Sequence, residues 1–147
     1  MGMFSSFDIN ASGLTAQRYR MDIISENIAN ANTTRTKDGT PYVRKVVTFS
    51  EKEGGASFSK VLGSTMETYP SKGVKVSHVY EDTKSEMNMV YDPAHPDADE
   101  NGYVTYPNVN IITEMTNLID ATRSYEANAT AFNASKSMAM TGLGLGK

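Results

Sequence analysis

The feature that most constrains this chain is a long apolar repeat close to its C-terminus. Alternating steps of four and three residues from Ile111 to Leu143 meet apolar side chains everywhere except at Thr122 and Lys136. The apolar members are Ile111, Met115, Leu118, Tyr125, Ala129, Phe132, Ala139 and Leu143. Asn108 directly follows Pro107 and is of a type that caps helix N-termini. We therefore predict one long helix over residues 108–147.

A helix of this length is more than the core of a 147-residue chain requires. At about 1.5 Å per residue, it extends for on the order of 50 Å. Between Asn117 and Thr141 only four side chains are charged, and most of the others are Ala, Asn, Ser or Thr. Because a freely solvated helix carries more charge, we expect other subunits to cover this one. An ordinary intramolecular helical hairpin is the alternative.

A second helix is predicted at the N-terminus, over residues 1–32. The same alternation of steps meets Phe4, Phe7, Ala11, Leu14, Met21 and Ile28, with Arg18 and Ser25 at its two polar places. Ile24 widens this apolar stripe. Asn27, Asn30 and Asn32 then precede Thr33 and supply residues with which helices end.

Between the two helices the apolar period changes to two, which is typical of strands. We predict short strands over residues 42–49, 73–80 and 86–91. The Pro-containing stretch 92–108 is predicted to be an ordered loop. The predicted fold class is α+β and mainly α: the terminal helices pair as an antiparallel coiled coil, and a small β unit with an ordered loop, residues 33–107, is inserted between them.

Composition and charge argue against several classes of function. The formal net charge is -3 and the basic residues are scattered, so we expect no nucleic-acid partner. The chain has no cysteine, which excludes disulfides and thiol chemistry. It has no apolar run of membrane-spanning length and no charged leader before an apolar segment, so neither a membrane span nor a cleaved signal peptide is expected. Gly2 with Ser6 fits only a short myristoylation pattern, and we expect no direct lipid anchor.

The strongest match to a chemical motif is the segment Asp97 to Gly102, which resembles the opening of a calcium-binding loop. The twelfth position of that loop is Asn108 instead of a bidentate Glu, and Pro96 and Pro107 disfavour flanking helices. We interpret the segment as a turn and keep a soluble calcium-binding module as the alternative function. His78 and His95 accompany no nucleophile or ligand set, so no catalytic residue, metal or cofactor is predicted, and the chain is not expected to be an enzyme.

Three segments carry a family resemblance. Residues 25–33 read Ser-Glu-Asn-Ile-Ala-Asn-Ala-Asn-Thr, residues 90–109 contain the Pro-containing loop, and residues 114–128 run from Glu114 to Asn128. Together they resemble the bacterial flagellar axial proteins, and the middle segment is similar to those of the proximal rod of the basal body. The family motif is carried by Asn27, Ala29, Asn30, Asn32, Thr33, Tyr91, Pro93, Gly102, Tyr103, Pro107, Asn108, Tyr125, Glu126 and Asn128.

The resemblance implies a subunit of the hollow, helically arranged shaft that crosses the cell envelope and transmits motor torque to the hook and filament. It also implies export through the flagellum-specific type III apparatus without a cleaved leader. The implied partners are the chain itself, other rod proteins and the membrane-embedded ring at the rod base, and the implied location is the basal body in the periplasmic region. Residues 50–70 match no family pattern.

The residues expected at the assembly interface lie on both predicted helices. We hypothesise that the N-terminal stripe packs with Met115, Leu118, Tyr125, Ala129 and Phe132, and that the remaining helix faces contact neighbouring subunits. The expected interface residues are Phe4, Phe7, Leu14, Met21, Ile24, Ile28, Ile111, Met115, Leu118, Ile119, Tyr125, Ala129 and Phe132.

Overall fold

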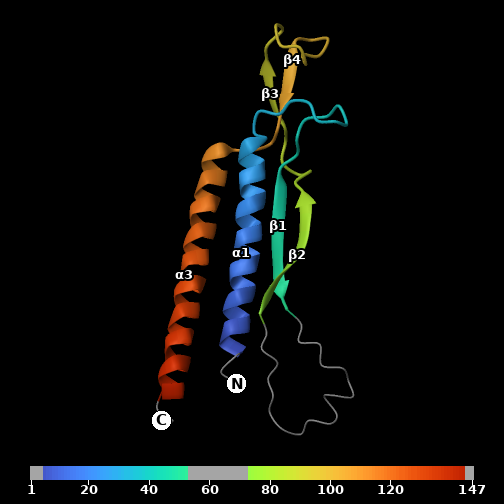
Figure 1. Cartoon of the computed structure of the whole chain (residues 1–147). Helices are drawn as coiled ribbons and strands as arrows, with labels where there is room; N and C mark the ends of the chain where they lie inside the picture. Colours follow the sequence, from blue (N-terminus) through green and yellow to red (C-terminus); the bar gives the residue numbers. More distant parts are fainter. Residues whose placement is uncertain (1–4, 53–72, 145–147) are drawn as a thin grey trace, which may run out of the picture. The chain divides into compact units, whose positions relative to one another are not determined.

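The computed structural model describes residues 5–52 and 73–144 (Figure 1). Its elements are α1 (Ser5–Ala29), β1 (Lys45–Glu51), β2 (Val74–Glu81), β3 (Asn88–Tyr91), β4 (Tyr103–Tyr106) and α3 (Ile111–Gly144). The strands form two separate two-stranded sheets, β1–β2 and β3–β4. Two long helices and a small β part confirm the predicted α+β, mainly α class. The segment 53–72, which contains most of the unmatched stretch 50–70, lies outside the described residues, as does Phe4.

The contacts divide the chain into two compact units, each containing part of both helices and of the β1–β2 sheet. Unit 1 comprises Met1–Tyr19, Phe49–Ser77 and Thr122–Lys147, and unit 2 comprises Arg20–Thr48 and His78–Ala121. Each unit therefore has its own packing and is described by itself.

In unit 1 the helices pack against each other in antiparallel fashion. The rings of Phe7 on α1 and Phe132 on α3 meet edge to face with centroids 5.0 Å apart. Further along, a Cβ atom at Gly13 would lie 2.8 Å from Oδ1 of Asn128 and 3.0 Å from its Cγ. The absence of a Cβ atom at Gly13 therefore leaves room for the Asn128 side chain. The start of α1 and the end of α3 consequently lie at the same end of unit 1 (Figure 1).

The β strands of unit 1 are attached to α1 through Ser12. Its hydroxyl donates a hydrogen bond to the carbonyl of Ile9 (2.7 Å) and accepts one from the backbone N–H of Val74 (3.0 Å). The N–H of Lys52 donates to the carbonyl of Gly73 (2.7 Å) and so extends the antiparallel β1–β2 pairing. The start of β2 is thereby held beside the Ser12 turn of α1.

Unit 2 has a small core in which Ala31, Tyr42 and Val109 cluster. Val104 of β4 and Ala121 of α3 are fully buried. The sheet β3–β4 is an antiparallel hairpin that pairs Asn88 with Tyr106 through to Tyr91 with Tyr103. A two-stranded ribbon is only marginally stable on its own, and all four residues of β3 are exposed.

Four sequence predictions need correction in unit 2. The stretch predicted as a loop, 92–108, contains strand β4 at residues 103–106, because its prolines flank the alternating Tyr-Val-Thr-Tyr run instead of interrupting it. The strand predicted over residues 42–49 begins only at Lys45, and the one over 86–91 only at Asn88. Asn108 is not the helix cap, since Oδ1 of Asn110 accepts the N–H of Thr113 (3.1 Å) and α3 starts at Ile111.

The apolar repeat of α3 does not keep one orientation along the helix. Ile111 and Met115, its first members, are 42% and 54% exposed, whereas Phe132 and Ala139 are half-buried. A repeat of 3.5 residues drifts by about 20° per heptad on a straight helix, so its first and last members point in different directions. Met115 is thus more exposed than the predicted packing against the N-terminal stripe implies, and that packing stays a prediction. In unit 2 the buried residues of α3 are instead Glu114 and Ala121.

Candidate assembly interface

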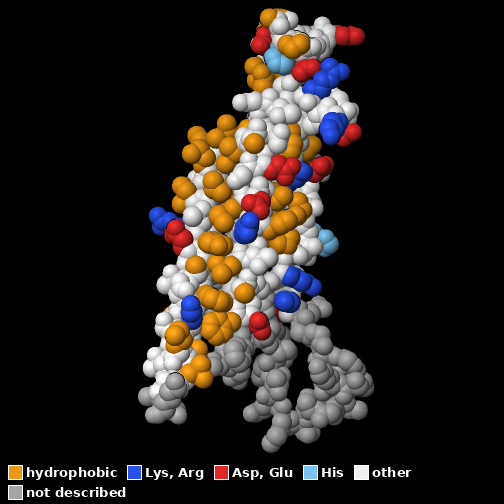
Figure 2. Space-filling view, viewed as in Figure 1, with side chains coloured by type: hydrophobic (Ala, Val, Ile, Leu, Met, Phe, Trp, Pro, Cys, Tyr) orange, Lys and Arg blue, Asp and Glu red, His pale blue; other side chains and the backbone are white. Residues whose placement is uncertain are grey.

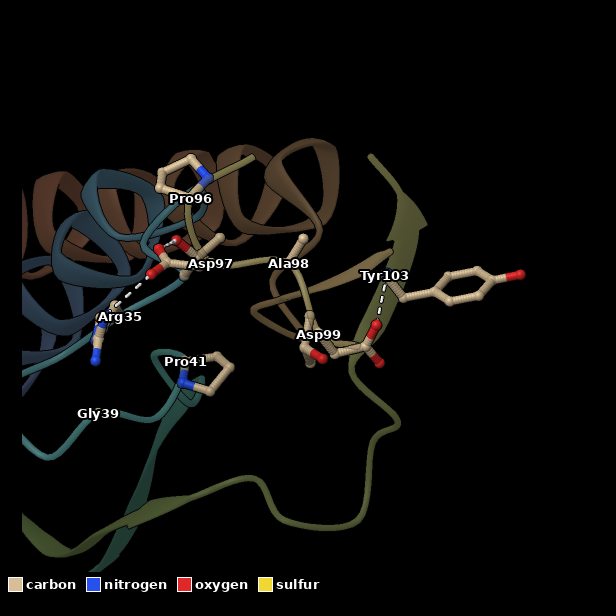
Figure 3. A pocket seen from close by; sticks show the side chains of 10 residues that line it. Arg35, Gly39, Pro41, Pro96, Asp97, Ala98, Asp99 and Tyr103 are labelled. Atoms are coloured by element: carbon tan, nitrogen blue, oxygen red, sulfur yellow. Dashed lines mark hydrogen bonds and ion pairs between the residues drawn. The ribbon is translucent and has the colours of Figure 1, made fainter. Parts of the chain in front are cut away.

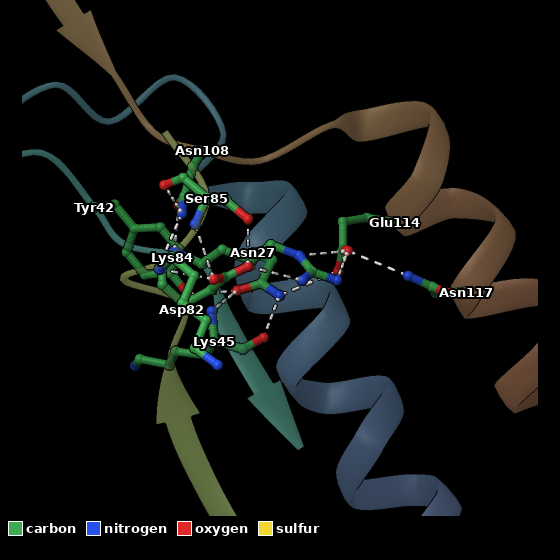
Figure 4. A network of polar contacts seen from close by, with 10 residues as sticks. Asn27, Tyr42, Lys45, Asp82, Lys84, Ser85, Asn108, Glu114 and Asn117 are labelled. Atoms are coloured by element: carbon green, nitrogen blue, oxygen red, sulfur yellow. Dashed lines mark hydrogen bonds and ion pairs between the residues drawn. The ribbon is translucent and has the colours of Figure 1, made fainter. Parts of the chain in front are cut away.

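A buried carboxylate organises the start of α3 in unit 2 (Figure 4). The side chain of Glu114 is 1% exposed. Its Oε1 accepts hydrogen bonds from Nε and Nη2 of Arg44, at 2.9 and 2.7 Å, and its Oε2 accepts one from Nδ2 of Asn27 at 3.1 Å. A buried charge is tolerated only when it is paired and hydrogen-bonded. The chain meets this requirement with Asn27 of α1 and with Arg44 of the segment before β1.

Asn27 satisfies all of its hydrogen-bonding capacity in this cluster. Besides Glu114, its Nδ2 donates to the carbonyl of Lys45 (2.8 Å), and its Oδ1 accepts from the hydroxyl of Tyr42 (2.8 Å) and the N–H of Lys45 (2.9 Å). It is 1% exposed. An amide with four partners of fixed position determines the register of α1 against the start of β1 and against α3.

The same environment raises the pKa of the Tyr42 phenol to about 12, chiefly through burial and then through the negative charges of Glu26, Glu81 and Glu114. Its hydroxyl therefore stays protonated and continues to donate to Asn27.

Asn108 and Asp82 extend the cluster to the end of β2. Oδ1 of Asn108 accepts from the N–H of Arg44 (2.9 Å), and its Nδ2 donates to the carbonyl of Asp82 (2.7 Å). Hydrogen bonds from the hydroxyl and N–H of Ser85, then from the N–H of Lys84, lower the pKa of Asp82, and the nearby Arg44 adds to this effect. We call Asn27, Tyr42, Arg44, Asp82, Asn108 and Glu114 the polar cluster.

Four of the predicted motif residues, Tyr91, Pro93, Gly102 and Tyr103, come together at the end of the β3–β4 hairpin. The rings of Tyr91 and Tyr103 meet edge to face with centroids 5.2 Å apart. Gly102 has φ +80°, and a Cβ there would lie 2.9 Å from the ring of Tyr91 and 3.2 Å from Pro93. Glycine is required for both reasons.

The Asp97 to Gly102 segment uses two of its carboxylates, those of Asp97 and Asp99, within the chain (Figure 3). Asp97 accepts from the hydroxyl of Thr34 (2.8 Å) and pairs with Arg35 (3.4 Å). Oδ1 of Asp99 accepts from the N–H groups of Asn101 (2.9 Å) and Tyr103 (2.8 Å), which is how an Asp closes a turn. Across residues 5–52 and 73–144, no group of three His, Asp or Glu side chains could hold a metal ion.

The predicted interface residues of the helices fall into an inner and an outer set. Ile24 is 5% exposed. Half-buried members of the inner set are Phe7, Leu14, Met21, Ile28, Leu118, Tyr125, Ala129 and Phe132. Ile111, Met115 and Ile119 lie on the exposed side of α3, where sequence reasoning missed Ile112, which is 78% exposed. Apolar side chains spread over the visible face of α3 in Figure 2.

Other motif residues make hydrogen bonds at the end of α1 and within α3. Asn30 donates from Nδ2 to the carbonyl of Glu26 (2.9 Å) and accepts from the Thr33 hydroxyl (3.2 Å) just beyond the end of α1 at Ala29. Asn128 donates to the carbonyl of Ser124 (2.8 Å). Asn32 and Glu126 are exposed, and Pro107 is fully buried.

Helices paired at the chain's two ends, with an inserted β part, are the arrangement expected of flagellar axial proteins, and the comparisons identify the chain as one of this class. The family profile "Flagella basal body rod protein" matches residues 7–37, and "Flagellar basal body rod FlgEFG protein C-terminal" matches residues 100–145. Within the described ranges, no helix is long and apolar enough to cross a bilayer.

Full-length relatives narrow the class to one family. The chain is 50% identical over 153 aligned positions to the flagellar basal-body rod protein FlgC of Bacillus subtilis, with 100% of both chains covered. It is 43% identical to FlgC of Borreliella burgdorferi, covering 99% of this chain and 98% of the relative. Identity to FlgC of Salmonella typhimurium is 40%, again with 100% of both chains covered. The chain belongs to the FlgC family of flagellar basal-body rod proteins.

Proposed function

We propose that this chain is a structural subunit of the flagellar basal-body rod, the hollow shaft that transmits motor torque to the hook and filament. It assembles with copies of itself and with other rod proteins in the periplasmic region of the envelope. It catalyses no reaction, so its function lies in its contacts.

The observation that carries the proposal is the apolar outer side of α3 at the start of the helix. Ile112, Met115 and Ile119 are 78%, 54% and 54% exposed within one stretch of eight residues. A helix that is covered only on its inner side normally carries polar residues on the other. A contiguous exposed apolar patch indicates an interaction surface, and a polymerising subunit supplies the required neighbours.

The paired helices, from residues 1–32 and 108–147, form the inner coiled-coil layer of the shaft in this proposal, and the β part lies outside it. Apolar interdigitation between neighbours then resists the sliding that torque would otherwise cause. The polar cluster supports this role because it fixes α1, α3 and the base of the β part in one register. Export through the flagellar type III apparatus without a cleaved leader, and docking to the membrane-embedded ring at the rod base, complete the proposal.

An acidic substitution on the outer side of α3 tests this function. We expect Ile119→Asp to leave the helical content and thermal unfolding of the isolated protein nearly unchanged, because the side chain is already exposed. The same change should abolish swimming of a strain that depends on this chain, since it places a charge in an apolar contact. Asn133→Asp adds the same charge at an exposed polar position of α3 and should swim. A normally motile Ile119→Asp strain would count against the proposed function.

A further inference from the structure

Unit 1 contains an apolar groove with a basic rim. The groove, of about 330 Å³, lies between α1 and the β strands, with Ala16, Tyr19, Val74 and Val76 among its lining residues. Lys52 and Lys75 also line it. Both lysines are exposed, and neither makes an ion pair with any residue that the structure describes. Such a groove fits an apolar segment with acidic neighbours.

Unit 2 carries an apolar ribbon with an acidic surround. On the β3–β4 hairpin, Met89 is 63%, Tyr91 64% and Tyr103 42% exposed. From Ser85 to Asn110 the sequence contains five acidic residues and no Lys or Arg. Figure 2 shows apolar and acidic side chains together at this hairpin. Exposed aromatic and Met side chains of this kind serve as anchors in protein interfaces.

The charges of the two units are complementary. The described part of unit 1 holds five basic and three acidic residues, whereas unit 2 holds six basic and twelve acidic ones. Unlike charges on the two halves of one chain favour contact between unit 1 of one copy and unit 2 of another. The charge distribution therefore favours a second copy of this chain as the partner.

We propose that the β3–β4 hairpin of one copy docks into the unit 1 groove of a second copy. Tyr91 and Met89 enter the groove, and Glu86 and Glu100 face Lys52 and Lys75. The contact is heterologous because its two sides are different surfaces, and where its rotation does not close a ring, repetition gives an open helical polymer. This inference rests on the proposed function and specifies one contact through which the subunits assemble.

The natural absence of cysteine permits a direct test by cross-linking. Lys75→Cys and Glu100→Cys variants are expressed together, and basal bodies are isolated and treated with a short bismaleimide. We expect a cross-linked dimer. When one copy carries both cysteines, we expect a series of higher cross-linked oligomers. Lys75→Cys with Lys37→Cys, an exposed position of unit 2 outside the hairpin, is the control and should give neither product.

A charge exchange tests the same contact without a cross-linker. The pair Lys52→Glu with Lys75→Glu should reduce incorporation into rods on the order of tenfold, since it brings like charges together. Glu86→Lys with Glu100→Lys should have a similar effect, and co-expression of the two should restore incorporation. Rods that contain the chain but give no cross-link above the control, or only a link within one copy, would overturn this docking and leave the proposed function standing. Absence of the chain from rods would overturn both.

Discussion

At the scale of single residues, Glu114 determines most of what holds unit 2 together. Its carboxylate is fully buried and accepts hydrogen bonds from the guanidinium of Arg44 and the amide of Asn27. We predict that Glu114→Leu lowers the free energy of unfolding by about 3 kcal/mol, because it leaves Arg44 without its buried partner. Arg44→Met should cost a similar amount, and the double variant should cost clearly less than the sum. Urea unfolding of the three variants measures this, and strictly additive losses would show that the two side chains are not coupled.

Tyr42 makes the stability of the same cluster depend on pH. Its pKa is about 12 in the folded chain and 10.0 as the ordinary value, so the folded state holds the proton more tightly than the unfolded state. The resulting stabilisation is complete below pH 10 and is lost as the pH rises from about 10 through 12. Tyr42→Phe removes one hydrogen bond and should lower the free energy of unfolding by about 1 kcal/mol. Its stability should not, however, show the additional decrease above pH 10. Urea unfolding of both proteins between pH 8 and 11.5 measures the free energy of unfolding at each pH. If it fell equally with pH in the two proteins, the alkaline loss would not come from Tyr42.

The sequence predicted little of the polar cluster. The family motif includes Asn27 and Asn108 but not Tyr42, Arg44 or Asp82, and Glu114 enters only as the first residue of a segment that resembles the family. The reason is physical: Asn27 and Glu114 are 87 residues apart in the sequence, and no periodicity relates an amide on one helix to a carboxylate on another. Only the fold brings them together.

At the scale of elements, the helices were predictable because burial on one side imposes a period that the sequence displays. Strand β4 was missed because four residues between prolines give a weak signal, although its partner β3 was predicted. The exposure of Ile111 and Met115 was not predicted, because a heptad count treats 3.5 and 3.6 residues per turn as equal over a helix of 34 residues.

The close approach of α1 and α3 in unit 1 gives a prediction about Gly13. Alanine there gains about 1 kcal/mol of helix propensity but meets the Asn128 side chain at 2.8 Å. We expect Gly13→Ala alone to be neutral or destabilising, and to become stabilising by about 1 kcal/mol in an Asn128→Ala background. Thermal unfolding of the four proteins in the cycle provides the measurement. Equal effects of Gly13→Ala in both backgrounds would show that Asn128 does not limit the helix contact.

At the scale of the whole molecule, the chain carries more apolar surface than its described residues cover. The outer side of α3 and the β3–β4 hairpin are separate exposed patches, and in the proposed assembly each of them contacts a different neighbour. A globular enzyme has no need of such surfaces, whereas a polymer of rod subunits requires them. Membership of the FlgC family and the exposed patches thus lead to the same account by independent routes.

An electron-microscopy reconstruction of intact basal bodies, with this chain traced in the rod, tests that account most directly. It should place Ile112, Met115 and Ile119 in contact with neighbouring subunits and leave no solvent around them. A rod in which these three side chains face solvent, or a basal body that lacks this chain, would contradict it.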